Sequence, residues 1–83
     1  FNAGLEVYPN PFSETIIIEW NKAAEKVSSV SLFDIAGKEM ERKEYHVVGA
    51  IRLETPRHIP AGNYLLQIQT DAAVYKMKMI KAE

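Results

Sequence analysis

Two histidines and a few serines are the side chains whose chemistry could support catalysis. A nucleophile of the triad kind needs a base within hydrogen-bonding reach and a third group that orients the base. His46 and His58 each stand beside a predicted turn or loop, and no serine has an evident partner of this kind. The two histidines with scattered carboxylates would make only a generic metal site. The sequence therefore predicts a protein without a catalytic centre, a metal site or a cofactor.

Three lysines near the end of the chain are the more distinctive charged residues. Lys76 and Lys78 alternate with apolar residues, and Lys81 follows shortly after them. Such charges can keep a strand soluble and protect a sheet edge from pairing with another chain. They can equally form a docking face, through charge complementarity or through addition of a partner's strand to that edge. Both interpretations stay open at this point.

Two further polar residues lie at predicted turns. Asp34 stands just before Ala36-Gly37, where an aspartate usually accepts hydrogen bonds from turn N–H groups; no local cluster supplies the 6–8 oxygens that calcium needs. Asn10 lies between Pro9 and Pro11, which fix two φ angles and favour an extended Asn10. We expect a stiff corner here. Asn10 either stabilises that corner or contacts a receptor.

The composition limits the classes of partner. Eighty-three residues make one domain, 47% of them hydrophobic, with a net charge of −1 and no cysteine. Acidic and basic residues are interleaved, so nucleic acid is not an expected partner. The longest apolar run is Ile16-Ile17-Ile18, far short of a membrane span, and no signal peptide begins the chain. If the protein is exported, we expect the sequence to be a fragment whose first export signal lies upstream.

Short alternating runs between turn residues organise the chain, and no stretch has the period of a long helix. The pattern predicts an all-β fold, a single immunoglobulin-like antiparallel β-sandwich of about seven strands. Trp20 should face inward. The expected strands are residues 5–8, 15–20, 27–35, 39–48, 50–55, 63–70 and 73–80, and the expected core contains Ile16, Ile18, Val30, Leu32, Leu53, Tyr64, Leu66, Ile68 and Met77.

The connections carry their own signals. Gly37 and Gly62 stand where a turn requires positive φ, and Asp71-Ala72 is a candidate two-residue hairpin turn. The run 39–48 is so rich in charge that we expect it at a sheet edge.

Four segments, in order along nearly the whole chain, resemble the C-terminal sorting domains (type A) of the type IX secretion system. Each segment alone is a weak signal, whereas four in the right order are specific. The first resembles the family's opening YPNP motif, the second its central V-x-L/I-Y/F-D-x-x-G-K/R segment, the third its L-P-A-G-x-Y-x-L segment and the fourth its lysine-containing last strand. They are Val7-Tyr8-Pro9-Asn10-Pro11-Phe12, Val30 to Lys38, Ile59 to Leu66 and Tyr75 to Lys81.

The resemblance implies a non-catalytic export signal, with residues 1–4 as a linker remnant and residues 5–83 as a monomeric sorting domain. Its implied partners are an attached N-terminal cargo, the type IX translocon or shuttle proteins and a sortase-like protease. The implied route passes through the periplasm to the outer-membrane surface or the medium, without membrane insertion. The recognition candidates are Pro9, Asn10, Pro11, Gly62, Tyr64, Lys76, Lys78 and Lys81.

Two alternatives remain from other classes. One is an adhesive or carbohydrate-binding accessory sandwich, for which an exposed Trp20 with Tyr45 would be the main indication. The other is a structural spacer domain of a secreted protein.

Overall fold

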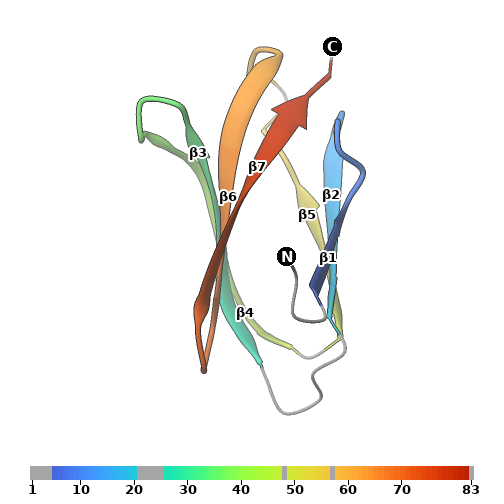
Figure 1. The fold of residues 1–83 in the computed structure, drawn as a ribbon, viewed down its shortest axis with the longest axis vertical. Helices are drawn as coiled ribbons and strands as arrows, with labels where there is room; N and C mark the ends of the chain where they lie inside the picture. The colour runs from blue at the N-terminus through green and yellow to red at the C-terminus, as the bar shows by residue number, and fades with distance from the viewer. Residues whose placement is uncertain (1–4, 21–25, 48, 57, 83) are drawn as a thin grey trace.

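The computed structural model describes residues 5–20, 26–47, 49–56 and 58–82, which form strands and no helix. The strands lie in two antiparallel sheets that face each other (Figure 1). Their bounds are β1 Leu5–Tyr8, β2 Thr15–Trp20, β3 Val27–Asp34, β4 Glu39–Val47, β5 Ala50–Glu54, β6 Gly62–Thr70 and β7 Val74–Lys81. The predicted all-β sandwich is confirmed. The predicted linker remnant, residues 1–4, lies outside the described residues.

The small sheet has the order β1-β2-β5, and the large sheet has the order β4-β3-β6-β7. Two hairpins, β3-β4 and β6-β7, build the large sheet, and β3 pairs with β6 at its centre. The charged strand β4 lies at one edge of this sheet, as its composition predicts, and β7 lies at the other edge.

The core between the sheets contains the residues that alternation places there, with one correction. Eight of the nine predicted core residues are buried, and Trp20 is buried as expected. Met77 is only partly buried, and Met79, at 1% exposure, is the methionine that β7 contributes to the core. The physical reason is local. Phe12 is hydrogen-bonded to the end of β7, and its ring meets Tyr64, the register partner of Met79, whereas no described strand covers the edge at Met77.

The predicted turn chemistry at the β3-β4 hairpin is confirmed. The Oδ1 atom of Asp34 accepts hydrogen bonds from the N–H groups of Ala36 at 2.9 Å and of Lys38 at 2.8 Å. Gly37 has the expected positive φ of 91°. The turn therefore uses the Asp34 carboxylate to satisfy backbone donors.

Gly62, the other glycine expected at positive φ, has a φ of 145° and begins β6. No heavy atom lies within 4 Å of where a Cβ would stand, so the requirement for glycine is conformational and not a matter of space. Among the recognition candidates, Gly62 therefore has a clear role in the fold.

Candidate recognition surface

The proline corner, residues 9–11, lies against the last strand of the chain. Asn10 Oδ1 accepts a hydrogen bond from the Ile80 N–H at 2.9 Å, and Asn10 Nδ2 donates to the Lys78 carbonyl at 3.4 Å. The following residue, Phe12, donates from its N–H to the Ile80 carbonyl at 2.8 Å and accepts from the Ala82 N–H at 2.7 Å. The corner therefore stabilises β7 through backbone groups about seventy residues away in sequence.

Phe12 is the hydrophobic anchor of this contact. Its side chain is completely buried, and its ring meets the ring of Tyr64 edge-on, with centroids 6.4 Å apart. The Tyr64 hydroxyl in turn donates to the Pro60 carbonyl at 2.6 Å. Burial, with the nearby negative charge of Asp34, raises the pKa of the Tyr64 phenol. Tyr64 is therefore a core residue that fixes the loop before β6, and a partner protein has little access to it.

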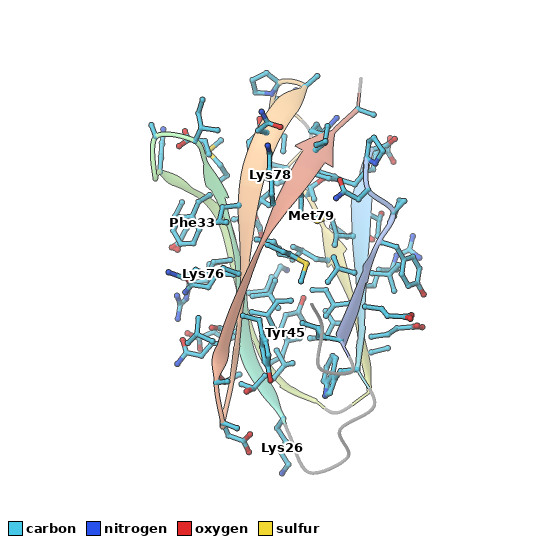
Figure 2. All side chains as sticks on the ribbon, viewed as in Figure 1. Lys26, Phe33, Tyr45, Lys76, Lys78 and Met79 are labelled. Atoms are coloured by element: carbon cyan, nitrogen blue, oxygen red, sulfur yellow. The ribbon has the colours of Figure 1, made fainter. Side chains whose placement is uncertain are left out.

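Lys76 and Lys78 lie together on the outer face of the large sheet, and Figure 2 shows Lys76 and Phe33 on the side away from the small sheet. Strand register places Lys76 opposite Gln67 and Lys78 opposite Leu65. The salt bridges within the described residues are Arg42–Glu44 and Arg52–Glu54, so neither lysine has a described carboxylate within 4.0 Å. We call these two lysines the basic face.

Lys81 does not belong to the basic face. Lys81 is an even number of residues from Met77 and Met79, so it belongs to the same face of β7 as they do, and it pairs in register with Gly62. Its ammonium group donates to the Ala82 carbonyl at 2.8 Å. The three lysines that are close in sequence therefore divide into an exposed pair and one that is bound locally.

The outer edge of β7 is only partly available for a partner's strand. Asn10 and Phe12 bond to the Lys78 carbonyl, to the N–H and carbonyl of Ile80 and to the Ala82 N–H. Because outward groups alternate along an antiparallel strand, those of Lys76 are the next ones along the edge. Strand addition, if it occurs, is thus limited to the Val74–Lys76 part of the edge.

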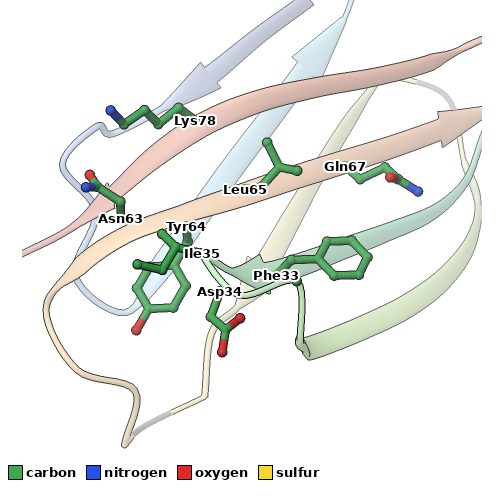
Figure 3. Close-up of a pocket in the computed structure, with 9 residues that line it drawn as sticks. Phe33, Asp34, Ile35, Asn63, Tyr64, Leu65, Gln67 and Lys78 are labelled. Carbon is green, nitrogen blue, oxygen red and sulfur yellow. The ribbon is translucent and has the colours of Figure 1, made fainter.

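Apolar side chains form a shallow hollow beside the basic face. It has a volume of about 540 Å³ and is lined by the β3-β4 hairpin and the start of β6. Figure 3 shows Phe33, Ile35 and Leu65 around it with Lys78 at one side. Ile35 is 85% exposed, and Leu65 and Phe33 are opposite each other on neighbouring strands. This hollow was not predicted from the sequence, although apolar residues at the outward positions of β3 and β6 were a usable signal.

The outer face of the small sheet has the opposite charge. Glu6 and Glu19 are directly opposite each other on β1 and β2, and the Tyr8 hydroxyl is hydrogen-bonded to Glu19. That hydrogen bond, followed by burial and the charges of both glutamates, raises the pKa of Tyr8. Arg52 and Glu54 form a salt bridge on this outer face too. Glu6 and Glu19 on one side of the sandwich therefore contrast with Lys76 and Lys78 on the other.

The histidines and carboxylates form no described metal site. His58 is exposed in the loop before β6, and the side chain of His46 lies outside the described residues. No group of three metal-ligating side chains comes together in the described parts of the chain. In those same parts, no helix is long and apolar enough to cross a membrane.

The sequence of this fold was compared with those of known proteins. Residues 6–82 match the family described as the secretion system C-terminal sorting domain. The chain belongs to this family. It is therefore a sorting signal of the type IX secretion system, and the resemblance drawn from its four motifs is confirmed. No curated protein matches the chain.

Membership of this family implies that the sorting domain is part of a secreted protein that reaches the cell surface or the medium. The family consists in general of non-catalytic sorting signals. The carbohydrate-binding alternative depended on an exposed Trp20, but this side chain is 8% exposed and belongs to the core. It cannot serve as a sugar-stacking platform.

Proposed function

We propose that the sorting domain is a folded export signal whose basic face is recognised by the type IX apparatus in the periplasm. The attached cargo crosses the inner membrane with its own N-terminal signal, and the domain then directs it to the outer-membrane translocon or its shuttle. A sortase-like protease afterwards cuts in the linker before Leu5 and joins the cargo to surface lipopolysaccharide. Residues 5–83 act as a monomer, and residues 1–4 belong to the linker.

The observation that carries this proposal is the basic face itself. Two ammonium groups lie on one face of a regular strand with no described carboxylate within 4.0 Å of either. Complementary charge across an interface speeds encounter with the right partner and suppresses wrong ones. Lys76 and Lys78 are thus suited to an acidic surface on the export apparatus.

The compact fold supports recognition of a surface rather than of an unfolded tail. The radius of gyration of 12.0 Å is that of a single compact domain of this length. Lys76 and Lys78 are held in fixed register by β6, and the corner fastens the end of the same strand. The spacing of the two charges is therefore set by the fold.

A reporter fusion tests the proposal. The 83-residue chain is placed behind a reporter that carries an inner-membrane export signal, in a host with a type IX system. We expect the wild-type fusion at the surface or in the medium, and we expect Lys76→Gln/Lys78→Gln to remain periplasmic. Lys38→Gln/Lys43→Gln is the matched control, because it changes the net charge equally at exposed positions of the β3-β4 hairpin.

The outcomes separate the parts of the proposal. The free energy of unfolding of each double variant should differ from that of wild type by at most about 0.5 kcal/mol per substitution, because all four lysines are exposed. Normal export of Lys76→Gln/Lys78→Gln would refute recognition of the basic face. The export apparatus would then have to recognise the corner, the loops or the free strand edge. A wild-type fusion that stays periplasmic while the host exports its own cargo would refute the sorting function itself.

A further inference from the structure

The apolar hollow and the basic face are parts of one surface. Strand register places Phe33 opposite Leu65, and Leu65 opposite Lys78, so the three side chains form one row across the outer face of the large sheet. Ile35, at the hairpin tip, adds an aliphatic side chain that is 85% exposed. A turn held by Asp34 and Gly37 does not need an isoleucine at this position, so its exposure has no evident purpose in the fold.

Charges of both signs stand around the hollow, with Lys78 and Asp34 in its lining and Glu39 opposite Phe33 on β4. Asp34 is the carboxylate among the described lining residues, and its Oδ1 atom is occupied by two backbone N–H groups of its own turn. Lys78 lies at the rim and Lys76 lies one position along the same face, without a described carboxylate within 4.0 Å. On the β7 side of the hollow, an occupant should therefore combine apolar side chains with carboxylates.

The shape of the hollow favours a protein segment over a small molecule. Its volume of about 540 Å³ is sufficient for one or two apolar side chains, but it is a shallow depression on a sheet. Sites for small ligands usually enclose most of the ligand and orient it with convergent polar groups. Here the polar groups, Asn63, Gln67 and Lys78, lie around an apolar floor. This arrangement suits an anchor side chain with polar contacts around it.

We propose that the hollow and the basic face together bind a segment of the export apparatus that presents an apolar side chain and carboxylates on the same side. An apolar anchor lies against Ile35 and Leu65, and the flanking carboxylates face Lys76 and Lys78. This inference deepens the proposed function and rests on it, because the partner is a component of the export apparatus. It adds the chemistry of the partner and the residues that it touches.

Peptide binding to the purified 83-residue chain tests the chemistry without the host. The probe is a short synthetic peptide in which each leucine or phenylalanine is followed two residues later by aspartate, with serine between them, so that an extended chain carries both on one side. Its control has lysine in place of each aspartate. We expect the acidic peptide to shift the amide NMR signals of Ile35, Leu65 and Lys78, and the basic peptide to leave them unchanged. Loss of one apolar contact should weaken binding about tenfold, so Ile35→Glu should bind at least that much more weakly.

Ala72→Glu is the matched control, since Ala72 is an exposed residue of the β6-β7 turn, at the far end of β6 and β7 from the hollow. It introduces the same charge, but it leaves the hollow intact. Both variants should keep the wild-type thermal midpoint. In the reporter fusion, we expect Ile35→Glu to stay periplasmic and Ala72→Glu to be exported.

Three results would overturn the inference. The first is a peptide that shifts no signals around the hollow, and the second is normal export of Ile35→Glu. The third is a concentration-dependent shift of the same signals without peptide, with a dimer in sedimentation, which would identify a second copy of the chain as the occupant. Retention of the wild-type fusion is a different result, because it contradicts the proposed function while the peptide experiment still decides what the hollow binds.

Discussion

The proline corner lies against β7, the strand that carries the basic face, and the two regions differ in what their polar groups do. Both Asn10 side-chain groups bond to the backbone of β7, and the adjoining Phe12 is buried in the core. Lys76 and Lys78 have no described carboxylate partner and project from the outer face. Two segments that both resemble family motifs thus have different physical roles. The first builds the domain, and the second is available to a partner.

The largest effect that can test this contrast is the loss of the Phe12 ring. Phe12→Ala removes a completely buried aromatic side chain and should lower the free energy of unfolding by about 3–5 kcal/mol. The matched control is Phe33→Ala, at a half-buried position on the outer face, which should cost well under half as much. Urea denaturation of both variants measures the difference. Equal losses of stability in the two variants would contradict a special structural role for Phe12 beside the corner.

Gly62 is the next largest test, because it was a recognition candidate and the structure gives it a conformational role. Gly62→Val places a β-branched residue at a φ of 145°, which should cost about 1–3 kcal/mol. Asn63→Val is the control, since the same side chain then stands at the next, exposed position, where φ is negative. Thermal unfolding compares the two. Unchanged stability of Gly62→Val would show that the chain does not need glycine there.

Much of the fold could be predicted from period-two alternation, and the exceptions have local causes. Val27 is buried although it is out of phase with Val30 and Leu32, because a bulge between Val27 and Ser29 shifts the phase of β3 by one residue. Nothing in the sequence Val27-Ser28-Ser29 indicates that bulge. Alternation predicts which face of a sheet a side chain occupies only where the register is regular.

The candidate site was harder to predict than the fold, because it depends on contacts between distant segments. The sequence indicated correctly that Lys76 and Lys78 share an outward face, but it could not show that Asn10 bonds to the strand that carries them. It also could not show that Ile35 and Leu65 meet beside Lys78. Pairing between sheet edges and loops is fixed by tertiary packing, and a single sequence carries no direct signal of it.

The smallest effect, and the sharpest test of the comparison, is expected from Asn10. Asn10→Ala removes the acceptor for the Ile80 N–H and the donor to the Lys78 carbonyl, and water can replace both at this exposed position. We therefore expect a loss of about 1 kcal/mol or less. Asn10→Asp keeps the acceptor and loses the donor, so its stability should lie between wild type and Asn10→Ala. Urea denaturation of the three proteins gives the order of their stabilities.

Export of the same variants then decides whether the corner has any role beyond the fold. A loss of about 1 kcal/mol leaves a domain of ordinary stability almost entirely folded. If the corner acts only through β7, both Asn10 variants should therefore be exported nearly as well as wild type, whereas Lys76→Gln/Lys78→Gln is retained. Retention of Asn10→Ala with near-wild-type unfolding would mean that the export apparatus contacts Asn10 directly. The division between a segment that builds the domain and a segment that is recognised would then be wrong, because a side chain bonded within the fold would also belong to the recognised surface.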